Sequence, residues 1–277
     1  MQPVNINQPA NATLISLDLI THVDCFGNST GAIDMTTTQG NPPYSFLWSG
    51  PAGYASNNED ISGLVAGNYT LVVTDNNGCS TSSGPHEVTQ PNAPLSIAFN
   101  GKVNVTCFGD NDGSISMSVS GGTTPYTFDW SSTWAGFVNP NSESLSDLGP
   151  GEYNLTVTDA NGCAESYGPI TITAPDNLAF STVVTDVLCF GQSTGSIEVN
   201  ATGGTSPYTY SIDNGANYQP SNTFNNLTAG TYQVIVKDDN DCLSDMQPVN
   251  INQPANATLI SLDRITHEGR FGNSTGA

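Results

Sequence analysis

Basic residues are almost absent from this sequence. Four Lys and Arg stand against 25 Asp and Glu, for a net charge of −21. Such a charge repels the phosphates of nucleic acid and anionic lipid, so we expect neither as a partner. Charged residues make up only 10% of the chain, and Asn, Thr, Ser and Gly must therefore form most of its surface. This composition is more typical of an extracellular β protein than of a cytosolic enzyme.

Long apolar runs, helical periodicity and catalytic motifs are also missing. No apolar run approaches the roughly 20 residues of a membrane span, so no membrane insertion is expected in this segment. The sequence contains no HExxH, P-loop or nucleotide-binding glycine motif. None of the histidines, His22, His86 and His267, stands beside a nucleophile motif. We therefore expect that the chain is not an enzyme.

A repeated frame organises the chain. The pattern Leu-x-x-Gly-x-Tyr, ending in a cysteine, occupies residues 64–79, 148–163 and 227–242. A Cys-Phe-Gly motif precedes each copy, and its cysteines lie 82 residues apart (25 to 107 and 107 to 189). This regularity predicts a tandem array of repeats rather than one domain. The predicted boundaries are 10–91 for repeat 1, 92–175 for repeat 2 and 176–254 for repeat 3, with 1–9 as the last strand of a preceding repeat and 255–277 as the start of a fourth.

The two ends of the chain are near copies of one another. Residues 246–277 match residues 1–32 except at four positions, among them Arg270 in place of the first cysteine. We interpret the chain as a segment of a longer protein. The absence of a signal peptide then has no bearing on secretion.

Each repeat shows the pattern of short β-strands. Apolar residues alternate with polar ones, as in Tyr69, Leu71 and Val73, and Gly- or Pro-containing turns separate the alternating stretches. Six or seven such strands in about 80 residues predict an all-β fold of tandem Ig-like antiparallel β-sandwiches. The Leu-x-x-Gly-x-Tyr run is similar to a tyrosine corner. Short junctions that contain Pro favour an arrangement like beads on a rod.

The six cysteines occur as two in each complete repeat. Their separations of 54, 56 and 53 residues predict one disulfide within each repeat, Cys25–Cys79, Cys107–Cys163 and Cys189–Cys242. Each such bridge would stabilise its repeat by about 4 kcal/mol in the chain-entropy model. The alternatives are buried free thiols or a metal site, although no CxxC pair or matching histidine supports a metal. Disulfides would place the chain in an oxidising, extracellular setting.

The repeated motifs carry a family resemblance. The frame reads Cys-Phe-Gly-x-x-x-Gly-x-Ile, then Gly-Gly-x-x-Pro-Tyr-x-(Phe/Tyr)-x-Trp, then Leu-x-x-Gly-x-Tyr through Asp to Cys. It resembles the SprB repeat family. The resemblance implies a very large protein secreted by Bacteroidetes-type bacteria, often through the type IX system, that forms a cell-surface filament and acts as an adhesin in gliding motility. Departures are Ile212 in place of the Trp, Gln39 in place of a Gly and Arg270 in place of a Cys.

Oxygen-rich turns are one candidate site. They follow the Leu-x-x-Gly-x-Tyr strand in each repeat, and repeat 2 has a second one after its Cys-Phe-Gly motif. Ca²⁺ takes six to eight oxygen ligands, so Ca²⁺ is the candidate cofactor. The alternative is a plain turn, in which Asn and Asp are favoured, and no complete EF-hand loop is present. The candidate ligands are Asp75, Asn77, Asp110, Asp112, Asp159, Asn161, Asp238 and Asn240.

Aromatic side chains in the variable loop are the second candidate site. Tyr54, Trp134, Phe137 and Tyr218 stand among Gly, Asn and Ser between the core strands. Exposed rings beside polar groups could stack on sugars and bind glycans. The alternative is that the rings fold back and extend the small core of each sandwich.

These observations lead to one function hypothesis with two rivals. We expect a segment of a giant extracellular, filamentous cell-surface adhesin, with surface polysaccharides or neighbouring copies of the filament as partners. The first rival is a self-assembling structural fibre that binds no external ligand. The second is a carbohydrate-binding module of a secreted protein.

Overall fold

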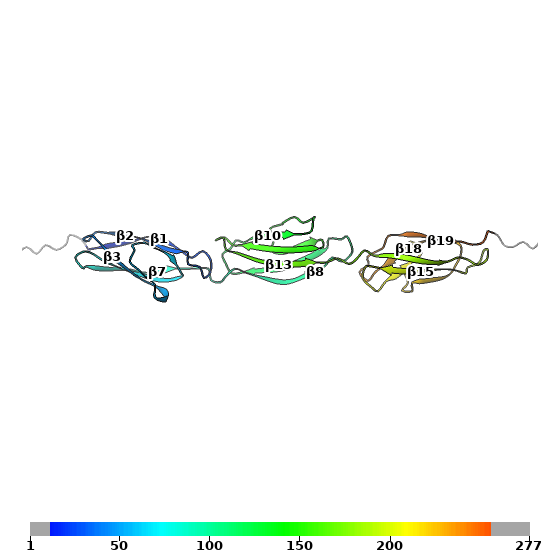
Figure 1. Cartoon of the computed structure of the whole chain (residues 1–277), viewed down its shortest axis with the longest axis horizontal. Coiled ribbons are helices and arrows are strands. Elements are labelled where there is room, and N and C mark those ends of the chain that lie inside the picture. The colour runs from blue at the N-terminus through cyan, green and yellow to red at the C-terminus, as the bar shows by residue number, and fades with distance from the viewer. Residues whose placement is uncertain (1–11, 256–277) are drawn as a thin grey trace, which may run out of the picture. The chain divides into compact units, whose positions relative to one another are not determined.

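The computed structural model describes residues 12–255, in which the regular elements are β-strands and one 3₁₀ turn at Pro51–Gly53, joined by turns and loops (Figure 1). They divide into two compact units. Unit 1 runs to residue 105 and resumes over 109–174, and unit 2 joins residues 106–108 to the chain from 175 onward. In this part of the chain no helix has the length and apolar character that a membrane crossing requires.

Unit 1 contains two β-sandwiches. In the first, one antiparallel sheet has the order β1-β2-β5 and the other β4-β3-β6-β7. A cluster of buried residues that includes Ile33 from β2, Trp48 from β3 and Leu71 from β6 lies between the two sheets. The strands are β1 (Leu14–Thr21), β2 (Gly31–Thr38), β3 (Ser45–Ser49), β4 (Ala55–Ser56), β5 (Ile61–Leu64), β6 (Gly67–Thr74) and β7 (Ser80–Val88).

The second sandwich of unit 1 repeats this plan. Its sheets have the orders β11-β9-β8 and β10-β12-β13. Ile115 from β9, Trp130 from β10 and Leu155 from β12 lie in its core. The strands are β8 (Ser96–Val103), β9 (Gly113–Ser120), β10 (Thr127–Ser132), β11 (Leu145–Leu148), β12 (Gly151–Thr158) and β13 (Ala164–Ile172).

Unit 2 contains the third sandwich, with sheets β14-β15-β17 and β16-β18-β19. Ile197, Val234 and Val236 lie in its core, and Tyr232 is only half-buried, unlike its counterparts in the other two sandwiches. The strands are β14 (Ala179–Thr185), β15 (Gly195–Thr202), β16 (Thr209–Ser211), β17 (Thr223–Leu227), β18 (Gly230–Lys237) and β19 (Gln247–Ile251).

The polar atoms of the large core side chains find backbone partners, as burial requires. The Trp48 indole N–H donates to the carbonyl of Asn58 at 3.0 Å, and that of Trp130 to Ser142 at 2.8 Å. The tyrosine corner is confirmed, because the hydroxyl of Tyr69 donates to the carbonyl of Val65 at 3.0 Å. The equivalent bonds run from Tyr153 to Gly149 at 2.7 Å and from Tyr232 to Thr228 at 3.0 Å.

The prediction of tandem Ig-like antiparallel sandwiches is confirmed, with two differences in detail. The sequence pattern predicts a last strand over residues 87–89, but β7 begins at Ser80, and Cys79 therefore lies in the turn of the β6–β7 hairpin. The variable loop ends in a short strand, β5, that was not predicted and that pairs with β2 in the opposite sheet. The partial repeats predicted at 1–9 and 255–277 fall, apart from residue 255, outside the described residues, as does Arg270.

Candidate functional site

A buried aspartate closes the hairpin that carries the second cysteine of each repeat. In repeat 1, Asp75 Oδ1 accepts the backbone N–H groups of Asn77 and Cys79, both at 2.9 Å, and Oδ2 accepts that of Asn41 at 3.1 Å. Only 7% of Asp75 is exposed. These bonds, first that of Cys79, outweigh burial and hold the pKa of Asp75 below its ordinary value.

The same arrangement recurs in the other two repeats. Asp159 is 5% exposed and Asp238 is 4% exposed, and each accepts three backbone N–H groups. The donors are Asn161, Cys163 and Thr123 around Asp159, all at 2.9 Å, and Asn240, Cys242 and Thr205 around Asp238, at 2.9, 2.9 and 2.8 Å. The aspartate therefore ties the cysteine turn to the Gly/Pro turn beside it.

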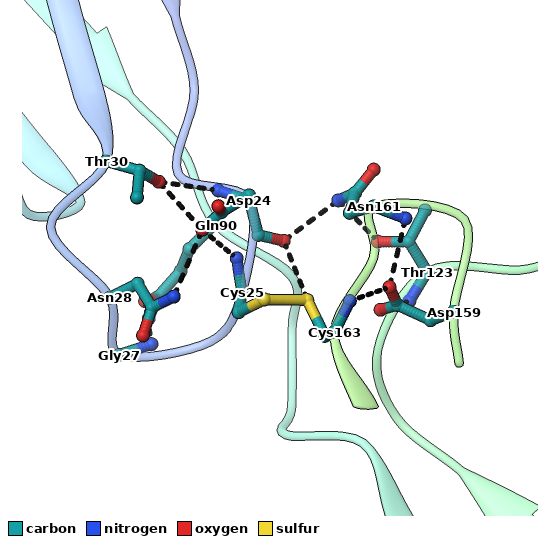
Figure 2. Close-up of a disulfide and its surroundings, with 10 residues drawn as sticks. All are labelled: Asp24, Cys25, Gly27, Asn28, Thr30, Gln90, Thr123, Asp159, Asn161 and Cys163. Atoms are coloured by element: carbon teal, nitrogen blue, oxygen red, sulfur yellow. Dashed lines mark hydrogen bonds between the residues drawn. A yellow bond between two sulfur atoms is a disulfide. The ribbon is translucent and has the colours of Figure 1, made fainter. Parts of the chain in front are cut away.

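The disulfides join consecutive repeats, and the predicted pairing within each repeat is wrong. Cys25 of repeat 1 bonds to Cys163 of repeat 2, with the two Cα atoms 5.8 Å apart (Figure 2). Within unit 2, Cys107 bonds to Cys242, at a Cα separation of 5.7 Å. The predicted pairs were Cys25–Cys79, Cys107–Cys163 and Cys189–Cys242.

The two cysteines of one repeat lie at opposite ends of its sandwich, which is the physical reason for this correction. Near Cys25, the N–H of Val23 donates to the carbonyl of Thr89, beyond the end of β7, at 2.9 Å. Cys79 lies just before the start of the same strand. Nine residues at about 3.3 Å each place the two cysteines about 30 Å apart, whereas a disulfide needs Cα atoms within about 7 Å.

The variable loop decides which end each cysteine occupies. β3 runs antiparallel to β6, and β5 runs antiparallel to β2, so that both β3 and β5 run toward the end that holds Cys25. The segment between them, which includes β4, must return along the sandwich without forming a full strand. The predicted pairing relied on the spacing of the cysteines alone and did not follow the direction of the strands.

A polar contact accompanies each disulfide. The side-chain amide of Asn161 donates to the backbone carbonyl of Asp24 at 2.9 Å and to Thr123 Oγ1 at 3.2 Å (Figure 2). In unit 2, Asn240 donates in the same way to the carbonyl of Thr106 at 3.4 Å. Each asparagine stands two residues before its cysteine, and each carbonyl belongs to the residue before the partner cysteine. The hairpin thus binds the Cys-Phe-Gly loop through the backbone carbonyl of the residue before the cysteine of that loop.

Two glutamines that were not among the predicted site residues indicate this arrangement. The N–H of Gly27 donates to Gln90 Oε1 at 2.8 Å, and that of Gly191 donates to Gln253 Oε1 at 2.9 Å. Both glutamines precede the proline that ends their repeat. Each glutamine stands at the end of its repeat and binds the Cys-Phe-Gly loop of the same repeat. This contact indicates that the first cysteine lies at the end of the sandwich from which the chain leaves toward the following repeat.

The remaining cysteines, Cys79 and Cys189, are free and exposed. Cys79 is equivalent to Cys163 and Cys242, and Cys189 is equivalent to Cys25 and Cys107.

The residues predicted to bind Ca²⁺ lie in turns whose aspartates are engaged by the backbone, and the Ca²⁺ site stays a prediction. Asp75, Asp159 and Asp238 direct their oxygens at N–H donors and lie in separate repeats, and Asp110 and Asp112 are exposed in another turn. Over residues 12–255, no three or more His, Cys, Asp or Glu side chains gather as a metal would need. The geometry supports the alternative, in which the acidic residues stabilise turns.

Three of the four predicted glycan contacts pack on the core. The ring of Tyr54 meets Tyr69 edge-on at 5.4 Å between centroids, and Phe137 meets Tyr153 in the same way at 5.6 Å. Trp134 packs against the core of repeat 2 and lies beside Gly149, where a Cβ atom would come within 2.4 Å of its ring. These contacts favour the core-extending alternative.

Surface pockets nevertheless lie beside both loops. Trp134 and Phe137, together with β11, line a pocket of about 350 Å³ in repeat 2. In repeat 3, Tyr218 lines a smaller one of about 230 Å³, and Lys237 Nζ lies 5.2 Å from the centre of its ring. The glycan contact predicted for these aromatic residues stays a prediction.

One family model matches parts of the chain. The model of the SprB repeat matches residues 20–53, 101–133 and 181–217, one segment in each repeat. No curated protein matches the chain.

Several solved structures of extracellular or surface domains are similar at low identity. The three N-terminal domains of the bacteriophage RB49 highly immunogenic outer capsid protein (Hoc) are 12% identical, with a TM-score of 0.39, over 87% of this chain and 95% of that one. The N-terminal eight Ig domains of the Down syndrome cell adhesion molecule (DSCAM) are 12% identical, with a TM-score of 0.34, over 91% and 44%. Domains 4–9 of the surface layer protein SbsC are 12% identical, with a TM-score of 0.23, over 90% and 48%. At these TM-scores the similarities carry no argument about function.

Proposed function

We propose that this chain, which contains three SprB repeats, is a non-catalytic segment of an extracellular, cell-surface adhesin filament. In this filament the repeats resist tension between an attachment site and the cell. The single observation that supports this proposal is the disulfide between consecutive repeats, Cys25–Cys163. Disulfides of this kind persist in oxidising, extracellular settings. A role in gliding and export by the type IX system belong to the same proposal.

The disulfide runs in parallel with the peptide junction between repeats 1 and 2. The peptide chain leaves repeat 1 at Gln90 and reaches repeat 2 at Ala93, whose carbonyl accepts the N–H of Gly122 at 2.9 Å. Beside this junction, Cys25 is bonded to Cys163 in the adjacent hairpin. Two covalent connections therefore join repeat 1 to repeat 2.

The two disulfides also shorten the covalent path along the chain. Between residues 12 and 255, that path needs only residues 12–25, 107–163 and 242–255. This is about a third of the residues, so full unfolding would extend the oxidised chain to about 300 Å and the reduced chain to about 850 Å, at about 3.5 Å per residue. A chain with this property can lose its folded structure under load without lengthening greatly.

Single-molecule pulling from both ends tests the mechanical part of the proposal. The fully unfolded oxidised chain should reach about a third of the contour length that the fully unfolded reduced chain reaches. The double variant C25S/C107S should release the full length without a reductant. Equal contour lengths for the oxidised and reduced wild-type chains would contradict the proposal.

A binding assay tests whether the repeats themselves adhere. Saturable binding of this chain to a polysaccharide-coated surface, and weaker binding to a bare hydrophilic one, would support adhesion by the repeats, with the pocket beside Trp134 as the first candidate contact. The absence of binding to either surface would leave the repeats as spacers and refute an adhesive role for this segment.

A self-assembling fibre is the second candidate function, because two exposed free thiols, Cys79 and Cys189, are present on the described part of the chain. Concentration-dependent assembly of the purified chain would favour it.

A further inference from the structure

The two free cysteines occupy positions that are bonded elsewhere in the same structure. Cys79 is the second cysteine of repeat 1, and the second cysteines of the other repeats, Cys163 and Cys242, are both in disulfides. Cys189 is the first cysteine of repeat 3, and both of its counterparts are bonded. The structure therefore contains two examples of the bond that each free cysteine is suited to make.

The hairpin around Cys79 already has the conformation of its bonded counterparts. The N–H of Asp75 donates to the carbonyl of Cys79 at 3.0 Å, and the equivalent distances are 2.9 Å at Cys163 and 3.0 Å at Cys242. The buried carboxylate accepts the cysteine N–H at 2.9 Å in all three hairpins. The hairpin is thus pre-organised whether or not its sulfur is bonded.

The loop around Cys189 likewise matches the bonded loop around Cys25. The N–H of Gln192 donates to the carbonyl of Cys189 at 3.1 Å, and the corresponding bond at Cys25 measures 3.0 Å. The N–H of Leu188 donates to Thr194 Oγ1 at 3.0 Å, as that of Asp24 donates to Thr30 Oγ1 at 3.0 Å.

We propose that Cys189 and Cys79 are complementary docking cysteines, each suited to the disulfide that joins consecutive repeats, and that in this segment by itself Cys189 of one copy forms that disulfide with Cys79 of a second copy. The side chain of Asn77 would donate to the carbonyl of Leu188, as Asn161 donates to Asp24 in the disulfide already formed. Such contact is heterologous, so successive copies join head to tail. This inference does not depend on adhesion to any external surface.

The bond forms by thiol–disulfide exchange with a small disulfide, such as oxidised glutathione. The thiolate of Cys79 attacks one sulfur of oxidised glutathione, which gives a mixed disulfide and releases one glutathione thiolate. The thiolate of Cys189 from the second copy then attacks the sulfur of Cys79 and releases the other glutathione. Two protein thiols are oxidised, one glutathione disulfide is reduced to two glutathiones, and the two thiol protons pass to the released thiolates.

The test uses two full-length variants, Cys79→Ser and Cys189→Ser, in a glutathione redox buffer at high protein concentration. Each variant alone should stay monomeric on a non-reducing gel, and an equal mixture should form a dimer. Mass spectrometry should identify the Cys79–Cys189 peptide pair in that dimer and the intact Cys25–Cys163 and Cys107–Cys242 bonds. The unmodified chain should form a ladder of oligomers.

Two outcomes would overturn the proposal. One is dimer formation by either variant alone to the same extent as by the mixture, because this means random oxidation of exposed thiols. The other is the absence of any linked dimer in the mixture. As a further readout, Asn77→Ala should lower the dimer yield several-fold, while Cys79 reacts with a small thiol reagent at an unchanged rate. An unchanged yield would refute the recognition by the asparagine.

Discussion

Asn161 and Asp24 lie 137 residues apart in the sequence, and the side-chain amide of Asn161 donates to the backbone carbonyl of Asp24 at 2.9 Å (Figure 2). Because the acceptor is a backbone atom, the side chain at this position is free to vary. Asp24, Thr106 and Leu188 occupy it in the three repeats. A different side chain in each repeat is thus compatible with one docking geometry.

Loss of the disulfide between repeats 1 and 2 should reduce stability, whereas loss of a free thiol should not. We expect Cys25→Ser to lower the free energy of unfolding by about 2–5 kcal/mol, the usual cost of removing a native disulfide. Cys79→Ser is the matched control and should stay within about 0.5 kcal/mol of the wild type. Denaturant titration without reductant measures both, and equal losses would contradict the assigned pairing.

The buried aspartate should matter for hairpin stability. Asp159→Asn keeps the size of the side chain but loses the charge and directs an amide group toward backbone donors. Hydrogen bonds to a charged group contribute about 1.5–3 kcal/mol each, and we expect a loss of at least that size. Asp110→Asn, at an exposed position, serves as the control. If both variants have the same melting temperature as the wild type, the carboxylate of Asp159 has no structural role.

Stability should fall in acid over a defined range. Hydrogen bonds to Asn217 and Ser211 lower the pKa of Asp213 to about 2 from 3.8, and bonds to Thr30 first and to the Cys25 N–H next lower the pKa of Asp24. A carboxyl group whose pKa is lower in the folded state stabilises the protein above its unfolded pKa. That stabilisation is lost as the pH falls from about 4 to 2.

Melting temperatures measured from pH 7 to pH 2 would check this expectation. We expect little change down to about pH 4 and a steep fall below it. A fall that begins well above pH 5 would point to groups other than these aspartates. Asp213→Asn should flatten the low-pH part of the curve, since it removes a carboxyl group whose pKa is lowered to about 2.

Trp134 should act mainly as a core residue of repeat 2. Because its ring packs on the core and against Gly149, Trp134→Ala should destabilise the protein by about 3 kcal/mol, near the lower end of the range for large aromatic residues. Gly149→Ala should move the ring by a steric clash. If Trp134→Ala instead leaves the melting temperature unchanged and abolishes binding to polysaccharide, the ring is a glycan contact.

Calcium should have no effect on stability. The carboxylates of Asp75, Asp159 and Asp238 already accept N–H groups, and we therefore expect the same melting temperature with excess EDTA and with added Ca²⁺. A rise of several degrees on adding Ca²⁺, reversed by EDTA, would support the calcium hypothesis.

Local patterns in the sequence were sufficient to predict the sandwich. The alternation of Tyr69, Leu71 and Val73 predicts one buried face, and all three side chains are at most 1% exposed. The tyrosine corner is equally local, because donor and acceptor lie four residues apart. These features depend on the period of a strand and on short-range hydrogen bonds, which neighbouring residues determine.

The cysteine pairing required the tertiary structure. The spacing of Cys25 and Cys79 suggested a bond, but a spacing says nothing about which end of the sandwich a turn occupies. That end depends on how the chain between β3 and β5 crosses from one sheet to the other, through a polar loop with no strong periodic pattern. The sequence by itself determined the repeats, their strands and their buried faces. Only the tertiary structure decided that Cys25 and Cys107 bond to the next repeat, because that depends on contacts between residues more than 130 positions apart.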